Sequence, residues 1–128
     1  MDKAKPRILI VEDDLSSQQY YTIILENSFD LEIVSTVVEA KKALAKTEFS
    51  VAIIDISLPG GENGIDLMRF MREKYPQKPT CIALTAHAFP QNRIEAMEAG
   101  AAEFFTKPIM SGVLIASLEK HIEALGDK

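Results

Sequence analysis

The sequence predicts an α/β fold in which five short parallel strands form an open, doubly wound sheet with five helices on its two faces. Two observations favour this fold class. Short apolar runs rich in β-branched residues recur along the chain, and segments with helical periodicity or helix-end signals separate them. Strands that alternate with helices are joined by right-handed crossovers into a parallel sheet. A length of 128 residues corresponds to one domain, so we expect residues 1–128 to form a single unit.

The first half of the chain is expected to contribute three strands and two helices. Arg7–Val11 and residues 51–54 are continuous apolar runs, which are typical of strands buried on both faces. Residues 31–35 form the second strand, and residues 38–46 form the second helix. Between the first two strands, residues 15–27 predict an amphipathic helix, because polar residues separate most of its apolar ones, which are Leu15, Tyr20, Ile23, Ile24 and Leu25.

The second half is expected to contribute two strands and three helices. Residues 59–61, Pro-Gly-Gly, are a loop signal. Pro90 suits the first turn of a helix, and Gly100 suits the C-terminal cap of the same helix. The apolar pattern predicts the remaining elements: a helix over residues 65–75, strands over residues 80–84 and around Phe104-Phe105, and a closing helix over residues 110–125.

The polar residues with potential chemistry gather at one position in this pattern. All of them stand at or just after the C-terminal end of a predicted strand: Glu12, Asp13, Asp14, Asp55, Thr85 and Lys107. In doubly wound sheets this edge carries the binding crevice. The pattern therefore predicts the place of a site as well as a fold. Within the group, Asp14 is expected to cap the helix that follows it.

The carboxylates predict a divalent cation at this edge. In the flavodoxin-like strand order 2-1-3-4-5 the first and third strands are neighbours, which would bring Asp13 and Asp55 together. Two carboxylates about 5 Å apart repel each other by about 3 kcal/mol at an effective dielectric constant of about 20, and Glu12 adds to this repulsion. Oxygen ligands that are few and open to water favour Mg²⁺ or Mn²⁺ over Zn²⁺.

Such an arrangement can accept a phosphoryl group. A carboxylate held beside a divalent cation can attack phosphorus and become an acyl phosphate. The developing charge requires a fixed cation and a hydrogen-bond donor, which Lys107 and the hydroxyl of Thr85 would supply. Phosphorylation adds roughly −1.5 to −2 charges, so a movement of Thr85 toward the new group would give a two-state element.

Four segments resemble, in this order and at these spacings, the signatures of response-regulator receiver domains: Ile8-Leu-Ile-Val-Glu-Asp-Asp14, Asp55-Ile-Ser-Leu-Pro59, Ala83-Leu-Thr-Ala86 and Thr106-Lys-Pro108. The resemblance covers nearly the whole chain. It implies that Asp55 is the phosphoacceptor and also a metal ligand. It further implies that Asp13 binds the metal directly, Glu12 through water and Ser57 through its backbone carbonyl.

The same resemblance identifies the expected switch. Thr85 resembles the family's switch hydroxyl, and Lys107 resembles the lysine that binds the phosphoryl group. Phe104 stands where the family places its switch aromatic residue, but it lacks the hydroxyl of the tyrosine often found there, so its switch would depend on packing. The bond from Lys107 to Pro108 resembles the family's cis peptide, which is rare in general.

A few further residues depart from the family pattern or have structural interpretations. Gly64, at the start of the third helix, falls one residue later than in the commonest pattern, and Gly60-Gly61 is expected to absorb the insertion. His87 would flank the pocket as a partly exposed loop residue that at most tunes the lifetime of the phosphoryl group. We expect His121 to lie at the surface and Cys81 to be a buried strand residue.

The resemblance implies a switch in phosphorelay signal transduction rather than an enzyme. The chain would take a phosphoryl group from a histidine kinase or a histidine phosphotransfer protein, with Mg²⁺-dependent self-phosphorylation and autodephosphorylation, and would signal to a downstream target that the sequence does not name. The donor is expected to dock against Leu15, Ser16 and the Pro108-Ile109 turn. Family members often dimerise through the fourth helix, the fifth strand and the fifth helix.

Composition argues against several other partners. The net charge of −5 gives no reason for direct nucleic-acid binding, which requires clustered Lys and Arg, or for attachment to an anionic membrane. No apolar run approaches the roughly 20 residues that span a bilayer. Cys81 is the single cysteine, which fits a reducing cytosol, and we expect a cytoplasmic protein.

Other functions on this fold remain open at this point. An electron-transfer protein that binds FMN would need a Ser/Thr/Gly-rich loop where Glu12-Asp13-Asp14 stands. A metal-dependent phosphatase with an aspartate nucleophile would need an Asp-x-Asp pair after the first strand and a cap domain. A degenerate receiver would only bind partners. The chain could be a complete single-domain regulator or a receiver cut from a longer protein, such as a hybrid kinase.

Overall fold

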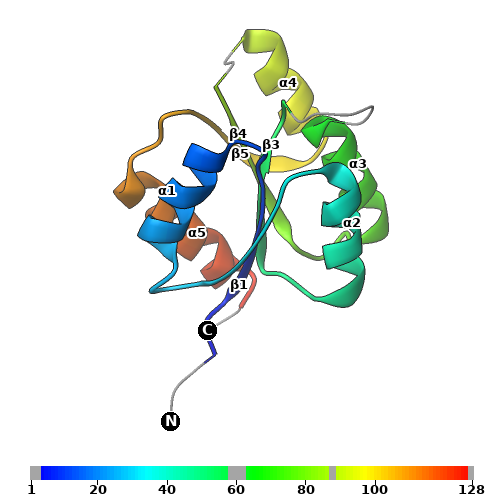
Figure 1. The fold of residues 1–128 in the computed structure, drawn as a ribbon. Coiled ribbons are helices and arrows are strands. Elements are labelled where there is room, and N and C mark those ends of the chain that lie inside the picture. The colour runs from blue at the N-terminus through cyan, green and yellow to red at the C-terminus, as the bar shows by residue number, and fades with distance from the viewer. Residues whose placement is uncertain (1–3, 58–62, 87–88, 127–128) are drawn as a thin grey trace.

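The computed structural model describes residues 4–57, 63–86 and 89–126 of the chain. These residues form one parallel sheet of five strands in the order β2-β1-β3-β4-β5, with helices on both faces (Figure 1). The predicted fold class and strand order are confirmed. The expected loop insertion at Gly60-Gly61 and the position of His87 lie outside the described residues.

The strands agree closely with the apolar runs of the sequence. The centre of the sheet contains β1 (Arg7–Val11), β3 (Val51–Asp55) and β4 (Thr80–Thr85). The edges are β2 (Asp30–Val34) and β5 (Ala101–Thr106). Since every pair is parallel, the C-terminal ends of all five strands lie at one edge of the sheet, and the described ends of the chain lie toward the opposite edge (Figure 1).

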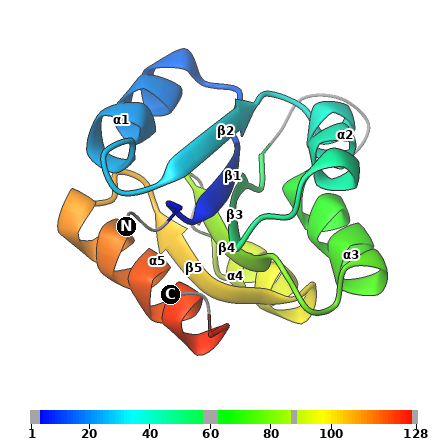
Figure 2. The ribbon, with the colours of Figure 1, turned by 90° about the horizontal axis from the view of Figure 1, so that it is seen from below.

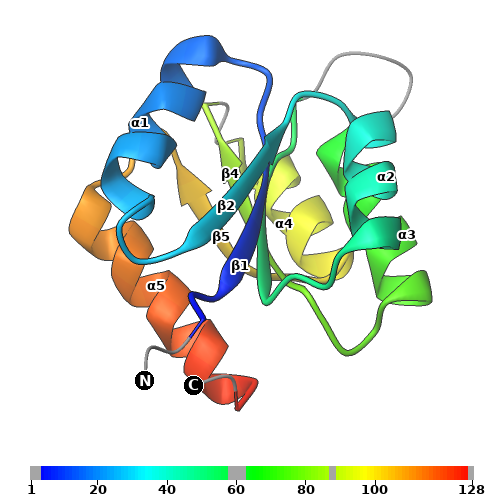
Figure 3. The same cartoon turned by 60° about the horizontal axis from the view of Figure 1, so that its bottom comes forward.

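The helices divide between the two faces of the sheet. One face carries α1 (Leu15–Leu25) and α5 (Ser111–Ala124). The other carries α2 (Val37–Lys46), α3 (Gly64–Lys74) and α4 (Pro90–Glu98), as Figures 2 and 3 show. No helix among the described residues is both long enough and apolar enough to cross a membrane.

The core has two halves because side chains alternate between the faces of each strand. In β1, Ile8 and Ile10 pack beneath α1 and α5, whereas Leu9 and Val11 pack beneath α2 and α3. Cys81 in β4 is buried, as predicted, and burial raises the pKa of its thiol to about 12. The central strands are therefore covered on both faces by closely packed side chains. This packing holds in place the polar residues at the C-terminal ends of the strands.

Local signals set the helix ends. The Oδ2 atom of Asp14 accepts a hydrogen bond from the backbone N–H of Ser17 at 2.9 Å, so Asp14 caps α1 as expected. Pro90 is in the first turn of α4, and Gly100 follows this helix with a φ of +116°, which only glycine adopts readily. Both predictions for α4 are confirmed.

The helix predicted for residues 15–27 is present as α1, but two of the apolar residues in its pattern do not pack on the core. Tyr21 and Leu25, four residues apart, are the buried residues of α1. Leu15 is 67% exposed and Ile23 is 71% exposed, although both were expected on the apolar face. The cap at Asp14 fixes where the helix begins, and the position of Tyr21 over the sheet fixes its rotation. Two large apolar residues consequently point to solvent.

Gly64 packs closely against β3 and provides a test of this arrangement. A Cβ atom at Gly64 would lie 2.3 Å from the carbonyl oxygen of Asp55 and 2.7 Å from the Cα of Ile56. We expect Gly64→Ala to lower the free energy of unfolding by about 1–3 kcal/mol, the usual cost of overpacking. Urea denaturation measures this change.

Gly112, near the start of α5, is the matched control. A Cβ atom there would meet nothing within 4 Å. Gly112→Ala should leave the stability unchanged or raise it by up to about 1 kcal/mol, because alanine loses less backbone entropy in a helix. Equal effects of the two substitutions would contradict the close packing of α3 on β3.

Candidate functional site

The site forms where β1 and β3 end side by side. Val11 is in register with Ile54, so Glu12, which follows β1, and Asp55, the last residue of β3, are neighbours. Carboxylate oxygen atoms of Glu12, Asp13 and Asp55 lie within 4.8 Å of one another. The structure thus brings Asp13 and Asp55 together, as the strand order predicts. Glu12 and Asp55 are buried, with 1% and 7% exposure, while Asp13 is open to solvent.

Lys107 enters this cluster from the loop between β5 and α5. Its Nζ atom lies 2.5 Å from Oε1 of Glu12 and 3.1 Å from Oδ2 of Asp55. Its backbone N–H donates to the carbonyl of Thr85 at 2.8 Å, which anchors the start of the loop to β4. The Lys107–Pro108 bond is cis, as expected. One ammonium group therefore contacts two buried carboxylates.

Burial and charge act against each other at this ion pair. Burial raises the pKa of Glu12 above its ordinary value of 4.5, and the hydrogen bond from Lys107 offsets this only in part. Burial lowers the pKa of Lys107, but the hydrogen bond to Glu12 and the charge of Asp55 outweigh it, so the pKa of Lys107 is raised overall. The ammonium group remains charged at neutral pH.

The carboxylate of Asp55 is held from two sides. Its Oδ1 atom accepts a hydrogen bond from the backbone N–H of Ser57 at 2.9 Å, and its Oδ2 atom accepts one from Lys107. Asp13 adds a third carboxylate on the side of the cluster that is open to solvent, so all the side-chain atoms that could bind a metal here are oxygens. Such a group suits a hard divalent cation that keeps some of its waters, and it does not suit Zn²⁺.

The two expected switch residues lie on neighbouring strands. Thr85, the last residue of β4, is fully buried. Phe104 in β5 is half-buried, packs on the half of the core that lies under α2, α3 and α4, and has the guanidinium carbon of Arg93 5.9 Å from its ring centroid. The aromatic ring is therefore held at the junction of β5 and α4.

Three residues of α1 that the sequence analysis did not select also contact this region. Ser17 Oγ lies 3.5 Å from Nζ of Lys107, and Gln18 Nε2 donates to the carbonyl of Glu12 at 2.6 Å. The hydroxyl of Tyr20 donates to the carbonyl of Ile109, also at 2.6 Å. For Ser17 and Gln18, the only sequence feature that could have indicated these contacts is their position in the first turn of the helix after the cap at Asp14. The contact of Tyr20 depends on the tertiary structure.

A groove of 410 Å³ lies beside the cluster, between α1 and the loop that follows β5. Its walls are mainly apolar, and its lining residues come from these two segments: Ser16, Ser17, Tyr20, Tyr21, Lys107, Pro108 and Ile109. The groove is continuous with Lys107. Three of the four residues against which a donor is expected to dock, Ser16, Pro108 and Ile109, line this groove, and Leu15 does not.

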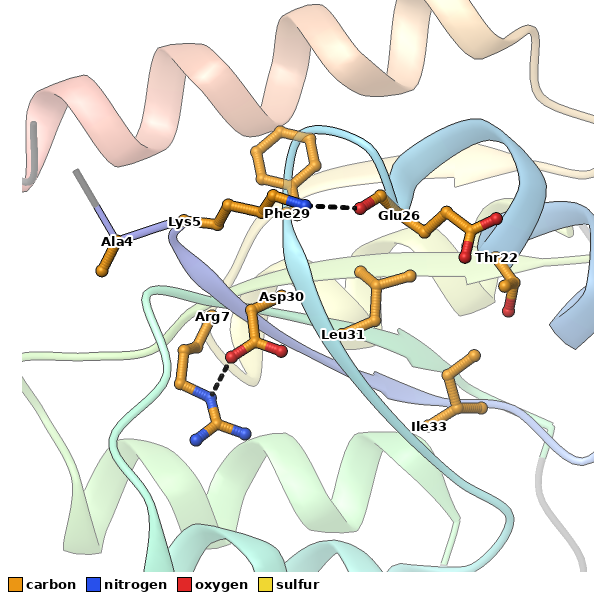
Figure 4. A pocket seen from close by; sticks show the side chains of 9 residues that line it. All are labelled: Ala4, Lys5, Arg7, Thr22, Glu26, Phe29, Asp30, Leu31 and Ile33. Atoms are coloured by element: carbon orange, nitrogen blue, oxygen red, sulfur yellow. Dashed lines mark hydrogen bonds and ion pairs between the residues drawn. The ribbon is translucent and has the colours of Figure 1, made fainter. Parts of the chain in front are cut away.

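A second cavity, of 570 Å³, lies toward the other end of the sheet (Figure 4). It opens beside the first residues of β1 and β2, where Arg7 forms an ion pair with Asp30 and Lys5 donates to the carbonyl of Glu26. The acid cluster is remote from it, because Glu12 and Asp13 follow the last residue of β1 and Asp55 is the last residue of β3. This larger cavity is therefore separate from the site described above.

His121 is not the surface residue that the sequence predicts. Its ring Nε2 lies 2.8 Å from Oε1 of Glu103, and its side chain is only 16% exposed. Ser117 and Lys120 contact the same oxygen, at 2.6 and 3.2 Å. These contacts join β5 to α5, and the hydrogen bond from Ser117 is the main cause of the lowered pKa of Glu103.

The raised pKa of Glu12 predicts how pH affects stability in the absence of metal. The contribution of Glu12 to stability is fully present below pH 4.5 and is lost as the pH rises through the pKa of the folded state. We expect the unfolding free energy of Glu12→Gln, minus that of the wild type, to increase as the pH rises above 4.5. Urea denaturation in a chelator measures this difference.

Asp14 provides a control of opposite sign. Hydrogen bonds from the backbone N–H and hydroxyl of Ser17 lower the pKa of Asp14 below 3.8. Its contribution to stability is therefore present above this pH and is lost as the pH falls, so Asp14→Asn should be most destabilising at neutral pH. Parallel pH profiles of the two variants would contradict the assignment.

Comparisons with known proteins agree with this geometry. The model of the response regulator receiver domain family matches residues 8–119. The response regulator protein PilR of Pseudomonas aeruginosa is 32% identical over 112 residues, which cover 87% of this chain and 25% of PilR. The chain thus spans about a quarter of the length of this relative.

Solved structures show the same likeness. A CheY-like response regulator receiver domain from Methanospirillum hungatei has a TM-score of 0.89 and 27% identity, and the match covers 96% of this chain and 98% of that one. The beryllofluoride-activated NtrC4 receiver domain dimer has a TM-score of 0.85 and 26% identity, over 93% and 98% of the two chains. With the acids of β1 and β3 and the lysine after β5 in these positions, this chain belongs to the response regulator receiver domain family.

Proposed function

We propose that this chain is a phosphorylation switch in which Asp55 accepts a phosphoryl group from a phosphohistidine. Receiver domains of response regulators receive phosphate from histidine kinases, and here the donor would be such a kinase or a histidine phosphotransfer protein. One observation carries the proposal. The carboxylate of Asp55 is held by Ser57 and Lys107 beside two further acids, at the strand edge where binding crevices form.

The chemistry requires one bond to form and one to break. A carboxylate oxygen of Asp55 attacks phosphorus as the P–N bond to the donor imidazole breaks, and the electron pair returns to that nitrogen. Lys107, already 3.1 Å from Asp55, offers positive charge to the phosphoryl oxygens as charge develops on them. The Thr85 hydroxyl is the proposed donor to the acyl phosphate. Hydrolysis of the acyl phosphate by water would reset the switch.

A divalent cation, Mg²⁺ or Mn²⁺, would be held by Asp13, Asp55 and the backbone carbonyl of Ser57, with Glu12 acting through water. Bound there, it would offset the repulsion among the acids and draw charge from the phosphoryl group. Lys107 already neutralises part of the charge on Glu12 and Asp55. The exposed carboxylate of Asp13 leaves the remaining side open to solvent and to the donor.

A downstream target would recognise the phosphorylated state at a surface near β5. We infer that Thr85 and Phe104 move together, and that the change reaches α4, whose Arg93 lies over the Phe104 ring. Residues 1–128 would act as a single receiver in the cytoplasm, toward a target still to be identified. A homodimer through α4, β5 and α5 is also proposed, and the NtrC4 relative is a receiver domain dimer by its description.

Phosphorylation at Asp55 is the first test. The purified chain, given acetyl phosphate and Mg²⁺, should gain the mass of one phosphoryl group, and the product should be labile to base, as acyl phosphates are. Asp55→Asn should reduce this gain below detection, because the amide cannot form an acyl phosphate. Intact-mass spectrometry measures both samples.

Asp30→Asn is the matched control, because Asp30 is an exposed aspartate at the far end of the sheet. This variant should be labelled like the wild type. A mass gain that persists in Asp55→Asn would sink the assignment of the phosphoacceptor. A wild type that takes no label would favour a receiver that only binds partners.

Metal binding is tested separately by thermal stability. Mg²⁺ at ten times its Kd should add about 1.4 kcal/mol to the unfolding free energy, which raises Tm by a few degrees. Asp13→Asn should lose most of this increase, while Asp30→Asn should keep it. An equal increase in the two variants would place the cation elsewhere.

A further inference from the structure

We propose that Tyr20 is a positioning residue for Lys107, acting through the backbone carbonyl of Ile109. The inference rests on the proposed phosphoacceptor function. The hydroxyl of Tyr20 in α1 donates to the Ile109 carbonyl at 2.6 Å, although the two residues are 89 positions apart in the chain. Ile109 is two residues after Lys107, in the same loop. A side chain of α1 therefore holds the segment that carries the charged group of the site.

The loop after β5 is anchored on both sides of the Lys107 side chain. On one side, the backbone N–H of Lys107 donates to the Thr85 carbonyl at 2.8 Å. On the other side, the Ile109 carbonyl accepts the hydrogen bond from Tyr20. Side-chain packing of Ile109 in the core adds apolar support, but it leaves the carbonyl direction undetermined. The hydroxyl of Tyr20 supplies that directional constraint.

The anchor on α1 is itself rigid. Tyr21 and Leu25 of this helix are buried in the core, and Asp14 caps its start. Ser17 lies three residues before Tyr20, hence on the same side of the helix. Its hydroxyl lies 2.9 Å from Oδ2 of Asp14 and 3.5 Å from Nζ of Lys107. One side of α1 thus contacts both the side chain of Lys107 and the backbone of its loop.

The position of the Lys107 ammonium group sets how well it can stabilise the charge that develops on the phosphoryl group. Nζ of Lys107 contacts Glu12 at 2.5 Å and Asp55 at 3.1 Å, and charge stabilisation of a transition state depends on such separations. A displacement of 1 Å in a positioned group can cost about 100-fold in rate. Loss of the hydrogen bond from Tyr20 would shift Lys107 by less than about 1 Å, because the hydrogen bond to Thr85 still holds the backbone of Lys107. We therefore expect a moderate effect.

The test is a double-mutant cycle with acetyl phosphate as donor, so that no docking partner is involved. Tyr20→Phe keeps the ring and removes only the hydroxyl. It should slow phosphorylation of Asp55 about 3- to 10-fold, the value of one hydrogen bond of this kind. In a Lys107→Met background, the same substitution should have no further effect, because the group that Tyr20 positions is gone.

Magnesium affinity provides a second readout that does not depend on phosphorylation. The ammonium group of Lys107 and a divalent cation compete for the charges of Glu12 and Asp55. Tyr20→Phe should therefore lower the Kd for Mg²⁺ measurably in isothermal titration calorimetry. The change should vanish in the Lys107→Met background. If that background phosphorylates too slowly to measure, the calorimetric cycle decides.

Tyr75→Phe is the matched control, because Tyr75 packs on Phe70 at the end of α3, away from Lys107. It should change neither the rate nor the affinity. Equal effects of Tyr20→Phe with and without Lys107, or no effect in either measurement, would overturn the role of Tyr20. A wild type that binds Mg²⁺ but takes no phosphoryl group would contradict the proposed function instead, and the calorimetric cycle would still test Tyr20.

Discussion

The whole site depends on one electrostatic balance, in which a single ammonium group lies against two buried carboxylates. Lys107 contacts Glu12 and Asp55, and Asp13 adds a third negative charge nearby. Buried carboxylates are tolerated only when positive charge and hydrogen bonds compensate them. Without a metal ion, Lys107 supplies the positive charge, and the backbone N–H groups of Asp14 and Ser57 donate hydrogen bonds to Glu12 and Asp55. The same crowding makes the cluster a suitable place for a divalent ion and for phosphoryl chemistry.

The fold makes this balance possible because parallel strands end at one edge. β1 and β3 are neighbours in the sheet, so Glu12 and Asp55 come together directly at the strand ends, and no long loop is needed to bring them there. The close contact of Gly64 with the carbonyl of Asp55 ties α3 to the same strand end. β5 lies two strands from β3, and the side chain of Lys107 crosses that distance. The strand ends thus place the acids of the cluster, and the loop after β5 carries the ammonium group to them.

α1 connects the acid cluster with a surface. Its first turn contacts Lys107 through Ser17 and the β1 end through Gln18, and Tyr20 holds the loop after β5. The outer side of the helix exposes Leu15 and Ile23, which a helix serving only the core would not need to do. Leu15 and Ile23 line a separate hollow on α1, whereas the groove beside Lys107 is lined by other residues of the same helix and by the loop after β5. A protein donor that contacts α1 would therefore touch the element that positions Lys107.

Sequence alone was sufficient for the order of elements, the strand order and the residues that meet at the strand ends. Apolar runs, caps and the spacing of polar residues are local features, and parallel pairing places their ends together. The buried face of α1, the contacts of His121 with Glu103, and the hydrogen bond from Tyr20 to Ile109 were decided only by tertiary structure. Helix rotation depends on how side chains pack on the sheet, and periodicity misjudged α1 because apolar residues stand on more than one of its sides. Contacts between residues 18 or 89 positions apart leave no mark in local sequence.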